Sequence, residues 1–114
     1  MSGRDRRRLD RDRRLAERKP CSLAVRLRES DGKFRLNWLL DISMTGAGAL
    51  VYDALPHPQV EGEIVASDVE KVFPFQARLV WSQQQTPGRV GLLFHDPSTE
   101  FQSWLTQYVS ALPQ

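Results

Sequence analysis

The sequence predicts a small all-β domain, an antiparallel barrel or sandwich that is covered by one C-terminal helix. Two observations predict it. Six short runs with alternating apolar residues recur along the chain, with turn residues between them, and one helical apolar stripe follows near the end. The length of 114 residues allows a single domain with a modest core and is too short for two.

The first two strands are predicted to form a hairpin. The first runs from Ser22 to Arg28, and its apolar residues share one face: Leu23, Val25 and Leu27. Asp31-Gly32 is a strong hairpin turn signal. The second strand runs from Phe34 to Ile42, and its apolar residues fall on one side: Phe34, Leu36, Trp38 and Leu40.

Four further strands are predicted, over residues 47–52, 62–67, 72–82 and 89–94. The register of the fourth strand stays open, with either Ile64 and Ala66 or Val65 facing inward. The apolar residues of the fifth strand share a face: Phe73, Phe75, Ala77, Leu79 and Trp81. Pro74 has no backbone N–H, which favours an edge position or a bulge at the start of that strand.

A helix is predicted after the sixth strand. Asp96 is a preferred N-cap residue, and Pro97 is a preferred first helical residue. The apolar residues that follow have helical spacing: Phe101, Trp104, Leu105, Tyr108, Val109 and Leu112. This stripe is expected to lie on the sheet, and Pro113 ends the helix. Core packing is expected for all three tryptophans, although Trp81 ends its strand near a polar loop, where its ring could stay accessible.

The composition excludes several classes of protein. The single cysteine, Cys21, excludes a disulfide framework and a cysteine-based zinc site, and is most simply a free thiol in a reducing compartment. No apolar run approaches the length of a membrane span, and no apolar segment follows the basic N-terminus as in a secretory signal. We therefore expect a cytoplasmic protein that does not insert into membranes.

Positive charge is concentrated at the N-terminus. Residues 1–18 hold eight arginines and four acidic residues, a net charge of +4, whereas residues 19–114 have a net charge of −2. Such an arm is typically flexible and has an anionic partner. Arginine suits phosphate better than lysine does, because the guanidinium can bind it through two hydrogen bonds. Several arginine pairs are spaced four residues apart. Arg14 and Arg18 directly precede the first strand and are the candidate pair for binding an anion; Arg7 and Arg11 are a rival assignment of that pair.

A polar segment, Asp41 to Gly46, follows the second strand. Asp41 and Ser43 are two residues apart, so in an extended segment their side chains would present hydrogen-bonding groups to one face. Gly46 would allow a close approach to the backbone. The alternative is a plain turn in which Asp41 and Ser43 bond to local backbone.

Enzymatic chemistry is not expected. Neither His57 nor His95 has a partner at metal-ligand spacing, and both are expected to be ordinary surface residues. No nucleophile-elbow pattern surrounds Ser43. We therefore expect no catalytic residues, no metal and no cofactor.

Taken together, these segments resemble the PilZ domain family of bacterial cyclic di-GMP receptors. The resemblance is carried by Arg13-Arg14-x-x-x-Arg18-x-Pro20, by the strand that begins Leu23-x-Val25-x-Leu27, and by Asp41-x-Ser43-x-x-Gly46. It continues through Leu79-Val80-Trp81, Gly91-Leu92-Leu93-Phe94 and the C-terminal helix. It implies a six-stranded antiparallel barrel with a C-terminal helix, a flexible basic arm over residues 1–12 and a PilZ domain over 13–114.

The resemblance also implies roles for individual residues. Arg14 and Arg18 would bind phosphate and the O6/N7 edge of guanine, and Asp41 with Ser43 would hydrogen-bond the other guanine. Gly46 would leave room for the ligand, and Trp81 is a secondary candidate for contact with a base. Arg13 indicates two intercalated ligand molecules, because family members with an arginine at this place tend to bind two.

Three functions remain in competition. The first is a non-enzymatic cyclic di-GMP receptor whose arm becomes ordered on binding and which signals to a downstream protein. The second is a small-barrel nucleic-acid-binding module with a basic arm; the acidic balance of residues 19–114 argues against it. The third is an interaction module that keeps the fold and binds no nucleotide.

Overall fold

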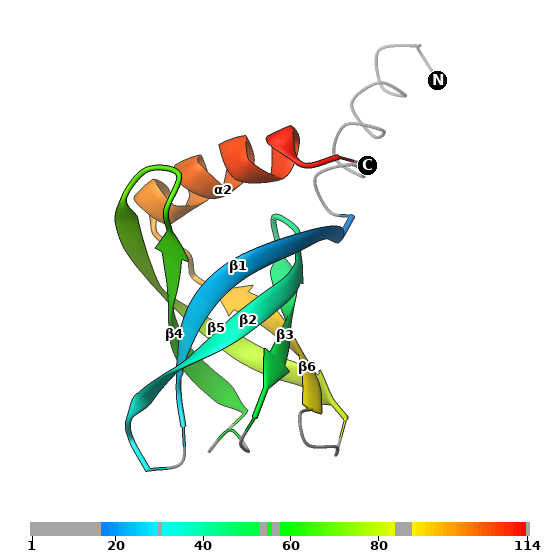
Figure 1. Cartoon of the computed structure of the whole chain (residues 1–114), viewed down its shortest axis with the longest axis vertical. Helices are drawn as coiled ribbons and strands as arrows, with labels where there is room; N and C mark the ends of the chain where they lie inside the picture. Colours follow the sequence, from blue (N-terminus) through cyan, green and yellow to red (C-terminus); the bar gives the residue numbers. More distant parts are fainter. Residues whose placement is uncertain (1–16, 30, 53–54, 56–57, 84–87, 114) are drawn as a thin grey trace.

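Six antiparallel strands close into a barrel in the order β1-β2-β3-β6-β5-β4, with α2 lying across one end (Figure 1). The elements are β1 (Lys19–Arg28), β2 (Phe34–Ile42), β3 (Gly46–Val51), β4 (Gln59–Ala66), β5 (Lys71–Ser82), β6 (Gly88–His95) and α2 (Thr99–Ala111). This computed structural model describes residues 17–29, 31–52, 55, 58–83 and 88–113. The barrel with a C-terminal helix is confirmed.

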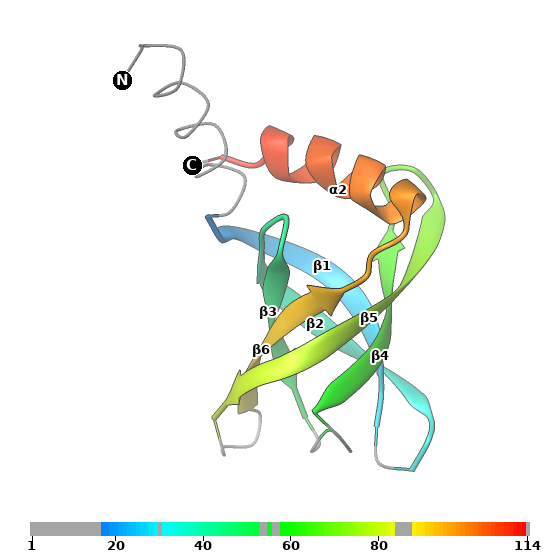
Figure 2. The same cartoon turned by 180° about the vertical axis from the view of Figure 1, so that it is seen from behind.

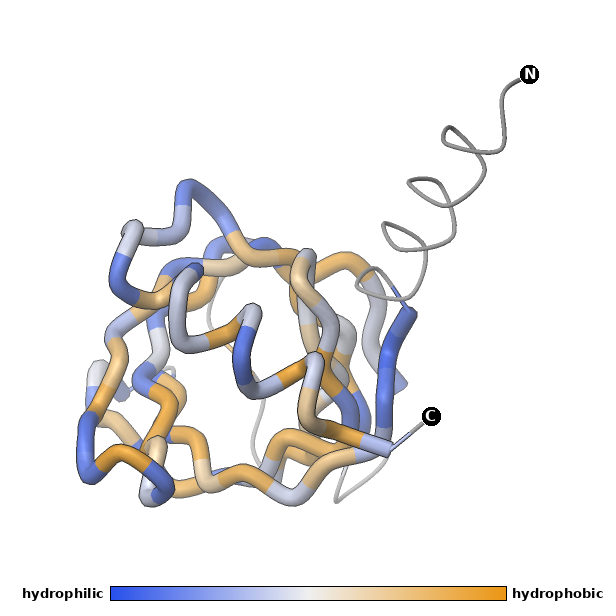
Figure 3. The backbone as a smooth tube through the Cα atoms, turned by 90° about the horizontal axis from the view of Figure 1, so that it is seen from above, coloured by the Kyte–Doolittle hydropathy of each residue, from blue (hydrophilic) through white to orange (hydrophobic). Residues whose placement is uncertain are grey.

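The core fills the barrel and the space beneath α2. Val25 and Leu27 of β1, Ile64 of β4 and Leu92 of β6 point inward and are fully buried. Figure 3 looks down on α2 and shows it crossing the mouth of the barrel. From this helix Phe101 inserts among three other rings, with centroid distances of 5.2 to 6.1 Å: Phe94, Phe73 and Phe75. The apolar stripe of the helix therefore closes the barrel end, as predicted.

The helix begins two residues later than its sequence signals predict. Ser98, not Asp96, is the N-cap residue, and its hydroxyl accepts a hydrogen bond of 3.1 Å from the backbone N–H of Phe101. Asp96 instead takes a positive φ of 47° in the turn that leaves β6. The prediction of Asp96 as N-cap was wrong because Ser98 is the residue with both extended backbone and a free hydroxyl at the helix entry.

Strand β2 turns the opposite face to the core from the one its apolar residues predict. Asn37 and Leu39 are buried, whereas Phe34, Leu36 and Trp38 are 37%, 56% and 40% exposed. The register explains this, because Leu39 lies opposite the inward Leu23 of β1, and residues directly opposite share a face. The prediction of core packing is therefore wrong for Trp38, and it is confirmed for Trp104.

Strand β5 changes face near its end. Phe73, Phe75 and Ala77 are buried, but a register shift between Leu79 and Trp81 leaves Trp81 exposed on the outside. Trp81 thus does not share the inward face of the strand, and its ring is accessible.

The remaining strand predictions are resolved by the pairing. Ile64 and Ala66 are the inward residues of β4. Strand β5 pairs with β6 only from Gln76 onward, so Pro74 has a paired strand on one side only, as an edge position requires.

Several predictions concern residues outside the described part of the chain. These are the arm over residues 1–12, Arg13, Arg14, the rival pair Arg7 and Arg11, and His57. Within the described residues, no helix combines the length and apolarity that a membrane crossing would need.

Candidate ligand-binding site

Four residues form a row across the outer face of the barrel. Asp41 of β2 pairs with Gly48 of β3, Gly48 pairs with Gly91 of β6, and Gly91 pairs with Trp81 of β5. Figures 1 and 2 show these strands as one continuous wall. The row therefore has a carboxylate at one end, an aromatic ring at the other, and two glycines, called here the glycine floor, between them.

The glycine floor is covered from both ends. The Gly48 backbone N–H donates a 2.8 Å hydrogen bond to Asp41 Oδ1, and a Cβ atom on Gly48 would lie within 2.9 Å of both Asp41 oxygens. A Cβ atom on Gly91 would clash with the indole of Trp81. Neither position has space for a side chain while Asp41 and Trp81 keep these orientations.

Arg18 and Asp41 meet at the β2 end of the row. Arg18 Nε lies 3.8 Å from Asp41 Oδ1, and both side chains are about one-third exposed. Pro20, two residues after Arg18, lies directly opposite Asp41 in the β1–β2 pairing. The fold thus brings the described arginine of the Arg-x-x-x-Arg motif against the aspartate of the second motif, 23 positions later in the sequence.

Ser43 does not share the exposed face of Asp41. Strand β2 ends at Ile42, and the turn that follows buries the Ser43 side chain to 1% exposure. Its hydroxyl accepts 3.2 Å hydrogen bonds from the backbone N–H groups of Thr45 and Gly46. The period-two argument fails here because Ser43 lies beyond the end of β2, and its bonds are those of the alternative, a local turn.

Gly46 is required by strand packing. A Cβ atom at this position would clash with the backbone carbonyl oxygen of Leu92 in β6. Its missing side chain therefore allows β3 and β6 to approach each other. The ligand-binding roles of Ser43 and Gly46 stay predictions.

Cys21 is a free thiol close to the site. Burial, followed by the negative charge of Asp41, raises the pKa of Cys21 to about 11. The thiol is protonated at neutral pH, and it makes a 3.6 Å contact to the carbonyl oxygen of Leu39. It is therefore a poor nucleophile.

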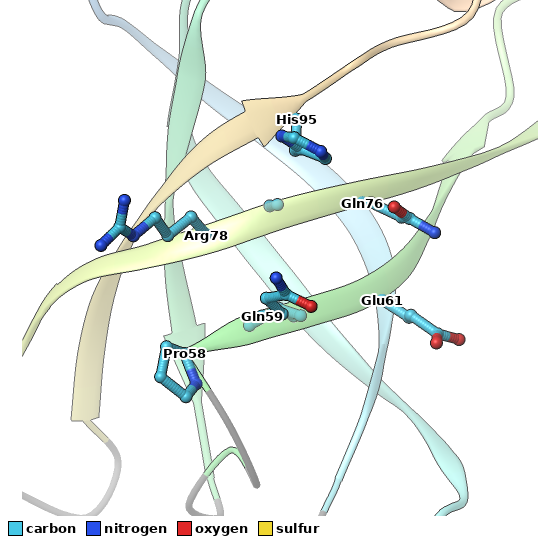
Figure 4. A pocket seen from close by; sticks show the side chains of 8 residues that line it. Pro58, Gln59, Glu61, Gln76, Arg78 and His95 are labelled. Carbon is cyan, nitrogen blue, oxygen red and sulfur yellow. The ribbon is translucent and has the colours of Figure 1, made fainter.

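A groove of about 640 Å³ with mixed polar and apolar lining lies on a neighbouring outer surface, over β4 and β5 (Figure 4). Its lining includes Gln59, Gln76 and His95, and it contains neither Asp41 nor Trp81. His95 is exposed at the end of β6, as expected of a surface residue. Among the residues that the structure describes, no group of three or more His, Cys, Asp or Glu could hold a metal ion.

Comparison with known proteins identifies the family. The model of the PilZ domain matches residues 12–111. The chain belongs to the PilZ domain family. A search of curated proteins found no match to the sequence.

Solved PilZ structures share this fold. The PilZ domain of YcgR from Escherichia coli, solved with c-di-GMP, aligns with a TM-score of 0.68 and 20% identity over 84% of this chain and 88% of its own. The PilZ domain of CeSA from a cellulose-synthesizing bacterium aligns with a TM-score of 0.63 and 19% identity over 83% and 96%.

A longer protein is also similar. The Bacillus subtilis inhibitor of motility, MotI/DgrA, aligns with a TM-score of 0.67 and 16% identity over 82% of this chain. The PilZ chain spans about half the length of that protein, 47%.

Sequence reasoning found Arg18, Asp41 and Trp81 but missed Gly48 and Gly91. The signal was present, because glycine inside an apolar strand often marks a close approach of another group. What the sequence does not contain is the order in which the strands pair, and this order places the two glycines side by side.

Proposed function

We propose that this PilZ domain is a non-enzymatic receptor for cyclic di-GMP. The observation that carries the proposal is the meeting of Arg18 and Asp41 at the edge of the glycine floor. Both belong to the motifs through which the sequence resembles cyclic di-GMP receptors, and the PilZ domain of YcgR was solved with that ligand.

The chemistry of these side chains suits the ligand. A guanidinium fork matches phosphate oxygens and the O6/N7 edge of guanine. The Asp41 carboxylate can accept hydrogen bonds from the N1–H and N2–H groups of a guanine, because only its Oδ1 is bonded to the backbone of Gly48. The exposed ring of Trp81 offers a surface on which a base can stack.

Binding is proposed to order the arm and to change the surface that a downstream protein contacts. Arg13 and Arg14 would close over the ligand from the arm, with two ligand molecules bound where Arg13 takes part. The hydrogen bonds that the guanidinium groups of the arm form with the ligand would offset the conformational entropy that the arm loses when it becomes ordered. Amide hydrogen exchange across residues 1–18 tests this, and unchanged exchange at saturating ligand would contradict it.

Helix α2 contacts both motif segments. Lys19, next to Arg18, donates a 3.0 Å hydrogen bond to the carbonyl oxygen of Val109. Met44, within the Asp41–Gly46 segment, is contacted at 3.7 Å by the hydroxyl of Thr106. These contacts give α2 a physical connection to the ligand site, so its exposed face is part of the surface that binding would alter.

The test is isothermal titration with cyclic di-GMP. We expect binding by the wild-type chain and a loss of about tenfold or more in both Arg14→Ala and Asp41→Ala, because each substitution removes charge-assisted hydrogen bonds. Glu61→Ala is the control, since it removes a carboxylate from the outer face of β4.

Each other outcome is also informative. Loss of binding in Arg11→Ala but not in Arg14→Ala would assign the motif to the rival pair. Absence of wild-type binding, or an affinity that Asp41→Ala leaves unchanged, would contradict the receptor function.

A nucleic-acid-binding module is the second candidate. The exposure of Trp38 and Trp81 favours it, because aromatic rings on the outside of a small barrel can stack on single-stranded bases. It predicts tight binding of single-stranded RNA with a steep dependence on salt concentration. The receptor function predicts weak RNA binding and competition by cyclic di-GMP.

A further inference from the structure

The outer face of β2 carries three exposed apolar side chains in a line, called here the apolar column. Phe34, Leu36 and Trp38 are two residues apart along the strand, so they share its outward face, and each is more than one-third exposed. Trp38 pairs with Ala24 of β1 on one side and with Leu50 of β3 on the other. Apolar residues therefore continue across three neighbouring strands at that end of the column (Figure 1).

The apolar column has the pattern and the size of a contact surface. Alternating apolar residues in a strand normally mark the face that is buried, and here that face lies outside the barrel. Its three side chains expose roughly 300 Å² in one place, as much as the largest apolar patch on many monomeric proteins. Patches of this size often bind another molecule, so we asked which kind of molecule fits this one.

The charges beside the apolar column are largely neutralised. On the β1 side, Arg26 forms a 3.4 Å ion pair with Glu63 of β4. Arg28 forms a 3.4 Å ion pair with Glu61 of the same strand. On the β3 side, Arg89 of β6 adds an exposed positive charge. A nucleic acid or an anionic membrane requires a cluster of uncompensated positive charges, so this surface better fits a protein surface that is apolar and close to neutral.

The apolar column is complementary to a second copy of itself. Its order is aromatic, leucine, aromatic, with Leu36 in the middle. When two columns stack in opposite directions about a two-fold axis that crosses β2 at Leu36, Phe34 of each copy faces Trp38 of the other. On β1, Arg28 lies beside Phe34, and the small Ala24 lies beside Trp38. The same axis therefore sets each Arg28 over the alanine of the other copy and not against a second arginine.

We propose that the protein forms a two-fold dimer in which the apolar columns of two copies pack against each other. With its polar rim, this interface buries about 1,200 Å² in total, the lower end of the range for specific interfaces. An interface of this size gives a reversible dimer, with dissociation in the micromolar range. The contact uses neither Asp41 nor Trp81, so it is independent of the proposed function.

Sedimentation equilibrium of the full chain without ligand, from about 5 to 500 μM, tests the dimer. Leu36→Glu should raise the dimer dissociation constant about thirtyfold or more, because the two central leucines meet and their replacements bring like charges together. Leu36→Met keeps an apolar side chain and should change the constant little. Val72→Glu is the matched control, because Val72 is similarly exposed on β5, a strand that neighbours neither β2 nor β3.

Thiol cross-linking locates the contact. In a Cys21→Ser background, Leu36→Cys places the single thiol of the chain at the centre of the column, and the two-fold axis brings it next to the same thiol of the other copy. A short bismaleimide should therefore join two chains of this variant into a covalent dimer. Val72→Cys in the same background is the control and should stay unlinked.

Other results would overturn the dimer. A wild-type chain that stays monomeric at the highest concentration would do so directly. A dimer that Leu36→Glu leaves intact, or cross-linking of Val72→Cys alone, would place the contact on another surface. A monomer that binds poly(U), with binding lost in Trp38→Ala, would assign the column to single-stranded RNA. None of these results bears on cyclic di-GMP binding, which Asp41→Ala tests separately.

Discussion

The pKa of Cys21 depends on the candidate site, because Asp41 lies close to the thiol. Its pKa of about 11 results from burial first and from the charge of Asp41 second. The thiolate is the species that reacts, so we expect slow alkylation by iodoacetamide at neutral pH and a rate that rises toward pH 11. Asp41→Asn should lower the pKa and speed the reaction at any fixed pH below it.

The pH profile of the alkylation rate, followed by mass spectrometry, measures this. The urea-unfolded chain is the control, and a folded-state midpoint near 9.0, the ordinary value, would contradict the prediction. The same shift fixes a direction for stability. Because the pKa is raised in the folded state, the contribution of Cys21 is intact below pH 9.0 and is lost as the pH rises through about 11.

At the residue scale, the sequence indicates which side chains could bind a ligand better than it predicts their burial and their hydrogen-bond partners. Arg18 and Asp41 were singled out because both belong to the motifs that resemble the PilZ family and because a guanidinium suits phosphate; their ligand-binding roles stay predictions. The burial of Ser43 was missed, because Ser43 follows the end of β2 at Ile42 and its side chain bonds inside the turn instead of continuing the alternation of the strand. The exposure of Trp38 was missed because the alternating apolar residues of β2 lie on its outward face, and only the register with β1 places Asn37 and Leu39 inward.

At the element scale, Lys19 joins the start of β1 to the last turn of α2. The residue is buried, at 6% exposure, and its ammonium group donates a hydrogen bond to the carbonyl oxygen of Val109. Lys19→Met keeps most of the apolar stem and removes the charged donor, so we expect a loss of about 1.5–3 kcal/mol in the free energy of unfolding. Val109 keeps its second bond, from the backbone N–H of Leu112.

Urea unfolding measures this loss, and amide hydrogen exchange localises it. Protection should fall mainly in the last turn of α2, with β5 and β6 little changed. Lys71→Met is the matched control, because Lys71 makes only an exposed ion pair with Glu100. A uniform fall in protection across the barrel would show that Lys19 supports the whole fold and not the attachment of this helix.

The elements themselves were largely predictable, and their ends were less so. Apolar runs and the turn residues between them predicted each of the six described strands, because these patterns can be recognised in the sequence itself. The start of α2 was misplaced since Asp96-Pro97 and Ser98 are both acceptable entry signals, and tertiary geometry selects between them.

At the scale of the whole molecule, the candidate site depends on a pairing that joins distant parts of the chain. Strand β3 pairs with β6, about 40 residues later, and this brings Gly48 beside Gly91. The closed-barrel topology was implied by the family resemblance. The periodicity of the strands alone is equally compatible with a sandwich. The glycine floor could not be predicted without it, because it belongs to no single segment.

Because the row crosses β2, β3, β6 and β5, a ligand bound there should stabilise the barrel as a unit. A ligand that binds only the folded state at 100 times its Kd adds about 2.7 kcal/mol to the free energy of unfolding. We therefore expect cyclic di-GMP to raise the Tm by several degrees, measured by differential scanning fluorimetry, and Asp41→Ala to abolish the shift. Cyclic di-AMP is the control ligand: it has the same phosphates, but adenine lacks the N1–H and N2–H groups that Asp41 would accept from. An equal shift with cyclic di-AMP would mean that the site reads phosphate alone, and Asp41 would then have no role in selecting guanine.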